Sequence, residues 1–198
     1  DLNNCAIAAA YTGSASLLDI ALLVGRDTIY AHTHSSVVQV AAQHGHIECL
    51  NIAKKHGYVQ TALLCKILND VALRGHFEVL KWMRSQNPPC PWNDDTFNSA
   101  VQFGNLNILK WMRSQNPPCQ WDRLSCKVAA SHGHLKILKW MRTQTSPCPW
   151  GELTCSGAAH NLDILKWLKT EGCPWDDFTC GIVAANRNLD ILKLLRYQ

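Results

Sequence analysis

The chain has 198 residues, of which 47% are hydrophobic and 17% charged, a composition that can bury a core and excludes wholesale disorder. No apolar run reaches the ~18 residues that a membrane-spanning helix needs, and no signal-peptide pattern opens the chain, so we expect no membrane insertion. The net charge of +4 is mild, and its whole excess falls in residues 75–198. Because the first residue is Asp rather than Met, we expect the chain to be part of a longer protein.

The sequence predicts a pair of helices in each of the first three repeats, at residues 1–32, 33–60 and 61–92, although the repeat pattern is less distinct there. In the first repeat the spacing predicts Asp1 as an N-cap, Cys5, Ala8 and Ala9 facing inward, and a second helix that uses Leu18, Ile20, Ala21 and Leu23. The next two repeats place apolar residues at the same spacing in their first helices, namely Val38, Ala41 and Ala42, then Leu68, Val71 and Ala72.

A stretch that begins at Gly75 then recurs almost unchanged along the chain. It runs as Gly75 to Arg84 with Pro89-Cys90-Pro91-Trp92, Gly104 to Arg113 with Pro118-Cys119-Gln120-Trp121, and Gly133 to Arg142 with Pro147-Cys148-Pro149-Trp150, with shorter copies from Asn161 and Asn188. The first copy completes the repeat at residues 61–92, and the other four define repeats at residues 93–121, 122–150, 151–175 and 176–198. Equivalent positions of the repeats are 27 to 30 residues apart. Self-similarity at such a period predicts a repeat architecture.

The repeat at residues 122–150 gives the clearest template. Asp122 is a good N-cap, and Cys126, Ala129 and Ala130 form the inward face of the first helix. The chain breaks at Gly133, and a second helix follows with apolar Leu135, Ile137, Leu138, Trp140 and Met141. The prolines then end that helix. The pattern therefore predicts an all-α solenoid of about seven stacked helix-turn-helix repeats.

These motifs resemble the ankyrin repeat. The residues that carry the resemblance are Ser125, Ala129-Ala130, Gly133-His134-Leu135, Ile137-Leu138 and, in another repeat, Gly172-Cys173-Pro174. The chain is most similar to the divergent Cys-Pro-Trp-Asp ankyrin repeats of large DNA viruses, algae and oomycetes. Ordinary ankyrin repeats have 33 residues, so the shorter repeats here imply β-hairpin fingers that are shortened or absent.

Ten cysteines suggest a disulfide framework at first sight, but most of them keep fixed repeat positions. Equivalent residues of stacked repeats lie about 10 Å apart, whereas a disulfide needs Cα atoms within about 7 Å. We interpret them as buried structural thiols and expect a reducing, intracellular location in the cytoplasm or nucleus. A disulfide or a bound metal stays open as an alternative for some of them.

Two histidine pairs have a spacing that occurs in metal sites, namely His44-Gly45-His46 and His132-Gly133-His134. No carboxylate or thiol completes a set at usable spacing, and in ankyrin repeats the Gly-His histidine commonly makes turn hydrogen bonds. We therefore predict no metal and no cofactor. The chain also has no glycine-rich phosphate loop and no serine elbow, so we do not expect an enzyme.

Tryptophans and basic residues form ladders in repeat register. One tryptophan row lies in second helices and the other in turns: Trp82, Trp111, Trp140 and Trp167, then Trp92, Trp121, Trp150 and Trp175. We interpret both rows as packing between repeats, with nucleic-acid stacking as the alternative. The basic rows are Lys81, Lys110, Lys139, Lys166 and Lys193, then Arg84, Arg113, Arg142, Lys169 and Arg196. They fit a solvated face, or else an acidic partner, nucleic acid or lipid phosphate.

The resemblance implies that a partner protein binds the concave face, made of outward positions of first helices and the tips before them. The implied residues are Gln39, Gln43, Asn69, Asn98, Gln102, Lys127, Ser131, Ser156 and His160, with the tip residues Asp94, Asp95, Arg123, Glu152 and Asp177. The tip acids could instead only complement helix N-termini. We expect a non-catalytic protein–protein interaction scaffold or structural subunit.

The sequence is also compatible with two alternative functions. One is a substrate-recognition arm of a ubiquitin ligase, because an F-box accompanies the repeats in some similar proteins. The other is a nucleic-acid binder that uses the basic ladder of the second helices, which would show a steep loss of affinity with salt.

Overall fold

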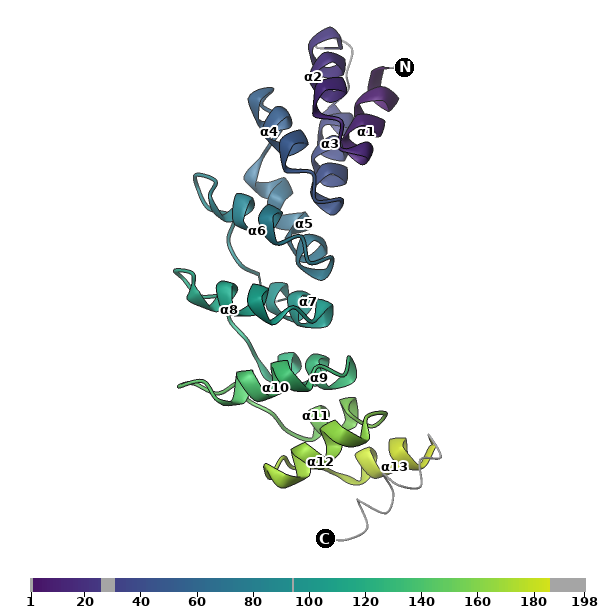
Figure 1. Cartoon of the computed structure of the whole chain (residues 1–198), viewed down its shortest axis with the longest axis vertical. Helices are drawn as coiled ribbons and strands as arrows, with labels where there is room; N and C mark the ends of the chain where they lie inside the picture. The colour runs from purple at the N-terminus through teal and green to yellow at the C-terminus, as the bar shows by residue number, and fades with distance from the viewer. Residues whose placement is uncertain (1, 26–30, 94, 186–198) are drawn as a thin grey trace. The chain divides into compact units, whose positions relative to one another are not determined.

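The computed structural model describes residues 2–25, 31–93 and 95–185 of the chain (Figure 1). Within these residues it contains thirteen α-helices and no strand, which confirms the all-α class. The chain divides into two compact units, Asp1–Thr96 and Phe97–Gln198. We call them the N-terminal and C-terminal units and describe each by itself.

The N-terminal unit consists of three helical hairpins. Its helices are α1 (Leu2–Thr12), α2 (Ala15–Val24), α3 (Ala31–Gln43), α4 (Ile47–Lys55), α5 (Thr61–Leu73) and α6 (Phe77–Arg84). The first helices α1, α3 and α5 pack in succession, and each second helix packs against its own first helix. The hairpin is therefore the structural unit of this part of the chain, as the sequence predicts.

The C-terminal unit continues the same element order. Its helices are α7 (Thr96–Phe103), α8 (Leu106–Ser114), α9 (Arg123–Ser131), α10 (Leu135–Arg142), α11 (Glu152–Gly157), α12 (Leu162–Thr170) and α13 (Asp177–Ala185). Helix α9 packs against both α10 and α11, and α11 packs against α13. The second helix that we expect in the seventh repeat lies outside the described residues.

A glycine in the left-handed conformation ends the first helix of the clearest hairpin. Gly133 has φ +78°, a value that a residue without Cβ adopts at little cost. The His134 N–H donates to the Ala129 carbonyl at 2.8 Å and the Gly133 N–H to the Ala130 carbonyl at 3.2 Å, which is the Schellman arrangement. The predicted break at Gly133 is confirmed.

The predicted N-cap of α9 is also confirmed. A carboxylate oxygen of Asp122 accepts from the Ser125 N–H at 3.1 Å, while the Ser125 hydroxyl accepts from the Asp122 N–H at 3.2 Å. This reciprocal pair is a capping box, and it satisfies two of the donors that a helix start leaves open. It fixes the point at which the chain leaves the preceding turn.

The core of the template repeat follows the predicted pattern, except that Leu135 and Trp140 of the second helix are half-buried. Cys126, Ala129 and Ala130 are buried in the first helix of the template repeat, and Ile137, Leu138 and Met141 are buried in the second. Small first-helix residues allow close approach: a Cβ added to Gly157 on α11 would lie 2.9 Å from the Lys127 carbonyl oxygen on α9. Helices α9 and α11 thus approach closely where α11 carries no side chain.

The inward face predicted for the first repeat is wrong by one residue. Ala6, Ala9 and Ala10 are buried, whereas Cys5 and Ala8 are exposed. Gly13, at φ +74°, ends this helix, and the buried alanine pair lies at the same distance before it as Ala129-Ala130 before Gly133. The run of three alanines hides this, because either Ala8-Ala9 or Ala9-Ala10 fits the pattern. In the second helix Leu18, Ala21 and Leu22 are buried, whereas Ile20 and Leu23 are 57% and 58% exposed.

The tryptophans pack between repeats but are half-buried rather than fully enclosed. The turn residue Trp121 meets Trp140 of the next second helix edge to face at 5.7 Å between ring centroids. Trp150 and Trp167 repeat this contact at 5.6 Å. The packing interpretation therefore holds for these pairs. In the second helices that carry a tryptophan, α6, α8, α10 and α12, the buried residues are Leu, Ile, Val and Met.

Two glycine substitutions test the close approach of α9 and α11. Gly157→Ala places a methyl group against the Lys127 backbone, and we expect it to lower the free energy of unfolding by about 1–3 kcal/mol. Gly181→Ala in α13 meets nothing within 4 Å and should stabilise by about 0.5–1 kcal/mol, since Ala is the better helix former. Urea unfolding of both variants measures the difference, and equal effects would contradict the close packing.

Candidate functional site

The exposed side of the first helices is the candidate interaction surface of the C-terminal unit. We define this first-helix surface by the exposed residues Gln102, Phe103, Arg123, Leu124, Ser131, Glu152, Leu153 and His160. The caps and glycine turns described above hold these helices by their backbone. The exposed side chains are therefore free to differ from repeat to repeat while the scaffold stays the same.

The structure places the predicted partner-binding residues in three groups. Exposed are Gln39, Gln102, Ser131, His160, Asp95, Arg123, Glu152 and Asp177; half-buried are Gln43, Asn69, Lys127 and Ser156; buried is Asn98. Asp94 lies outside the described residues. Most of the predicted set can thus reach a partner, and what it binds stays a prediction.

Asn98 corrects the sequence interpretation, because it is not a solvent-facing residue. Its side-chain oxygen accepts from the buried Ser125 hydroxyl at 2.6 Å. In the N-terminal unit, the Asn69 oxygen accepts from the Thr96 hydroxyl at 3.0 Å in the same way, and Gln43 donates to Asp70 at 2.9 Å. These amides join neighbouring repeats, since a buried hydroxyl needs a partner.

Sequence reasoning missed the apolar members of this surface. Leu124, Leu153 and Phe103 are 37%, 45% and 44% exposed. Leu124 and Leu153 occupy the same position of consecutive repeats, just after the helix N-cap. A search for variable polar residues passes over them, although leucine next to a cap and outside the inward pattern was a usable signal. Exposed apolar residues amid polar ones are typical of binding surfaces.

Not every charged tip residue stabilises the N-terminus of the helix on which it lies. Glu152 and Asp177 lie in the first turns of α11 and α13, where acids favour the helix dipole. Arg123 is the first residue of α9, where a cation is disfavoured for the same reason. Helix stability explains the two acids but not Arg123, which leaves the arginine as a stronger candidate for contact with a partner.

The Gly-His histidines connect repeats. His134 Nε2 lies 3.2 Å from the Gln102 carbonyl oxygen, and His76 Nε2 lies 2.8 Å from that of Gln43. A carbonyl oxygen only accepts, so Nε2 donates in both cases. Among the described residues no three His, Cys, Asp or Glu side chains gather in a way that could hold a metal ion.

The arginine row is not a free basic face. Nη1 of Arg142 donates to the Cys148 carbonyl at 2.8 Å, and its guanidinium lies 4.0 Å from the Trp150 ring centroid. Arg113 makes the same contacts with the Cys119 carbonyl, at 2.8 Å, and Trp121, at 4.1 Å. The row therefore clamps the turns, which corrects the expectation that both basic rows lie on a solvated face.

The lysine row does remain at the surface in the C-terminal unit. Lys110, Lys139 and Lys166 are exposed there. In the N-terminal unit Lys81 instead donates to a Glu78 carboxylate oxygen at 2.7 Å. Lys193 and Arg196 lie outside the described residues. A nucleic-acid surface built from both rows would thus lose most of its arginines.

The cysteines are free thiols, and most are buried. Burial and the neighbouring Cys65 thiol, 3.8 Å away between sulfur atoms, raise the pKa of Cys90 to about 12. A hydrogen bond with the Cys126 thiol and burial likewise raise the pKa of Cys148 far above its ordinary range. Sequence reasoning compared equivalent residues of different repeats, and so it missed these thiol pairs within one repeat.

Comparison of the chain with models of known protein families and with curated protein sequences finds no match. Among the described residues, no helix is both long and apolar enough to cross a bilayer.

Thiol reactivity tests the burial of the cysteines. Exposed Cys5 should react fastest with iodoacetamide near pH 8, whereas Cys90 and Cys148 should react far more slowly, because little of either thiol is ionised. Mass spectrometry of peptides after timed labelling measures each rate, and labelling in urea is the control that should equalise them. Native-state labelling of Cys90 as fast as that of Cys5 would contradict the structure.

Proposed function

We propose that the chain is a non-catalytic interaction module of ankyrin-repeat type, a scaffold or structural subunit that binds a partner protein through its first-helix surface. The resemblance of Ala129-Ala130 and Gly133-His134-Leu135 to the ankyrin pattern supports the family. The capped helical hairpins support a role in which a constant framework presents variable side chains.

The observation that carries this proposal is the pair of exposed leucines at equivalent places in consecutive repeats. Leu124 and Leu153 are flanked by charges of opposite sign, Arg123 and Glu152. Apolar anchors surrounded by polar groups are the usual composition of an interface core and its rim. A partner that covers both leucines would remove them from water and pair with the two charges.

The alternatives carry less support. The arginines that nucleic acid would need make turn contacts instead, as with Arg113 and Arg142. A substrate-recognition arm of a ubiquitin ligase remains a more specific version of the proposed function, and it rests on the resemblance alone. A reducing intracellular location agrees with ten cysteines that are thiols rather than disulfides.

Affinity capture from the source cells tests the proposal. The double variant Leu124→Asp, Leu153→Asp should lose stoichiometric protein partners by tenfold or more, about 1.4 kcal/mol or above, because carboxylates replace the apolar anchors. The measurement is quantitative mass spectrometry of the captured proteins, after circular dichroism has confirmed that the variant is folded.

Leu23→Asp is the matched control, since Leu23 is equally apolar and 58% exposed but lies on the second helix α2. It should retain the partners. Unchanged capture by the double variant would refute the proposed surface. Recovery of nuclease-sensitive nucleic acid in place of protein would favour the nucleic-acid alternative.

A further inference from the structure

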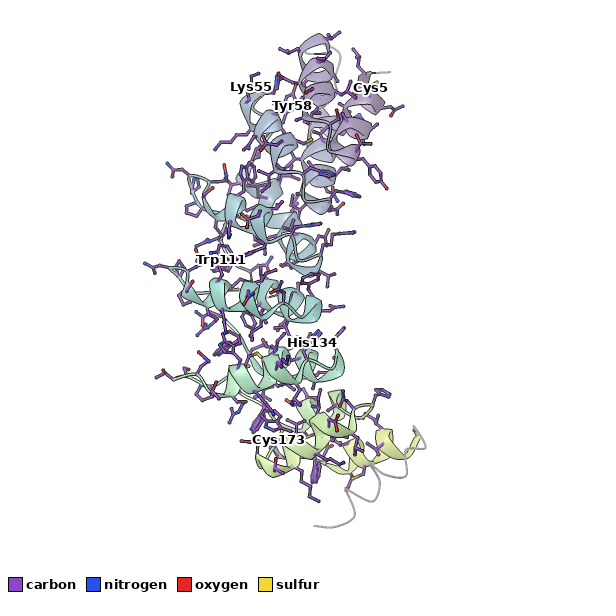
Figure 2. The ribbon with its side chains drawn as sticks, viewed as in Figure 1. Cys5, Lys55, Tyr58, Trp111, His134 and Cys173 are labelled. Atoms are coloured by element: carbon purple, nitrogen blue, oxygen red, sulfur yellow. The ribbon has the colours of Figure 1, made fainter. Side chains whose placement is uncertain are left out.

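A groove of about 540 Å³ opens in the C-terminal unit beside the N-terminal end of α10. The apolar side chains that line it are Leu106, from the start of α8, and Leu135 and Ile137, from α10. Lys136 and Lys139 line it as well, and both are exposed. Figure 2 shows His134, the N-cap of α10, at this end of the helix. The groove thus combines apolar surface with two cations.

The N-terminal unit contains the equivalent groove with the opposite chemistry. It measures about 260 Å³ and is lined by His76, Phe77, Glu78 and Val79 at the start of α6. There the Glu78 carboxylate accepts from Lys81 at 2.7 Å, and the Lys81 ammonium also lies 4.1 Å from the centroid of the Phe77 ring. The acid that lines this groove, Glu78, is therefore paired with a lysine of the same helix.

The difference comes from one repeat position, the second residue of the second helix. Among the described second helices this position holds Ser16, Glu48, Glu78, Asn107, Lys136 and Asp163. Lys136 is the only cation in that set. Where the N-terminal groove has an acid to pair with Lys81, the C-terminal groove therefore has a second lysine beside Lys139.

The surrounding charges reinforce this difference. The salt bridges found among the described residues, Lys55–Asp19, His56–Asp19 and Lys81–Glu78, all belong to the N-terminal unit. Residues 97–198 hold 12 Lys and Arg against 7 Asp and Glu, whereas residues 1–96 hold 7 against 8. The positive end of the α10 dipole adds to the potential at the groove. Its electrostatics favour an anionic occupant.

We propose that this groove binds an acidic peptide segment of a partner protein. Carboxylates of the segment pair with Lys136 and Lys139, and an apolar side chain between them packs against Leu106, Leu135 and Ile137. A peptide suits the site better than single-stranded nucleic acid, because the described lining includes no Trp, Tyr or Phe on which a base could stack. The site is separate from the first-helix surface and does not depend on it.

Fluorescence polarisation with the full 198-residue chain tests this proposal. The probe is a fluorescein-labelled peptide built from repeats of Glu-Leu-Glu, compared with the same peptide built from Gln-Leu-Gln. We expect the acidic peptide to bind at least about tenfold more tightly. Lys136→Glu, which recreates the Glu78–Lys81 arrangement, should weaken its binding by about tenfold or more. Lys136→Gln provides a second variant if the charge reversal impairs folding.

Lys166→Glu is the matched control, because it makes the same charge change in the same unit on an exposed residue that does not line the groove. It should leave binding within about twofold of the unmodified chain, apart from general screening effects. Equal losses in Lys136→Glu and Lys166→Glu would overturn the proposal, since the peptide would then respond only to net charge. No saturable binding would overturn it too. Oligothymidylate that binds as tightly, with the same dependence on Lys136, would reassign the groove to phosphate.

Discussion

The turns that follow α6, α8 and α10 are each held by one arginine. Arg142 holds the Cys148 carbonyl and stacks on Trp150, and Trp150 in turn packs against Trp167 of the next repeat. A guanidinium that both donates to a carbonyl and covers an aromatic face is well suited to this position, because its charge stays partly solvated while its plane packs. The contact between repeats, Trp150 with Trp167, therefore depends on the contact of Arg142 with Trp150 inside one repeat.

This arrangement explains why the framework can stay constant while its surfaces differ. The cap of α9 and the turn after α10 are held by Asp122, Ser125 and Arg142, which are not members of the first-helix surface. The first-helix surface and the α10 groove share no residue, since the first is centred on Leu124 and Leu153 and the second on Lys136. Their chemistry is also different, since the former is an apolar patch with mixed charges and the latter is a cationic groove.

Local signals were sufficient to predict the all-α class and the helical hairpins, but they were not sufficient for the details of the surface. The break at Gly133 and the cap at Asp122 follow from the residues themselves, so the sequence predicts them correctly. The phase of the first helix does not, because Ala8, Ala9 and Ala10 fit two phases equally well. The spacing of apolar residues also does not predict which polar side chains meet between repeats. Nothing in the sequence near Asn98 indicates that its amide meets a hydroxyl of the following repeat.

Packing of a histidine ring against the glycine of the preceding repeat restricts where residues can be inserted or removed. His46 lies over Gly13 and His76 over Gly45, and a Cβ at either glycine would fall 2.7 or 2.8 Å from the histidine ring. In these repeats a bare glycine meets the histidine of the following repeat, whereas Gly133 meets Asn161 instead. Whole repeats carrying both halves of this contact can be gained or lost without altering it. A single residue inserted within a hairpin would displace both halves at once, which makes the repeat the natural step of variation.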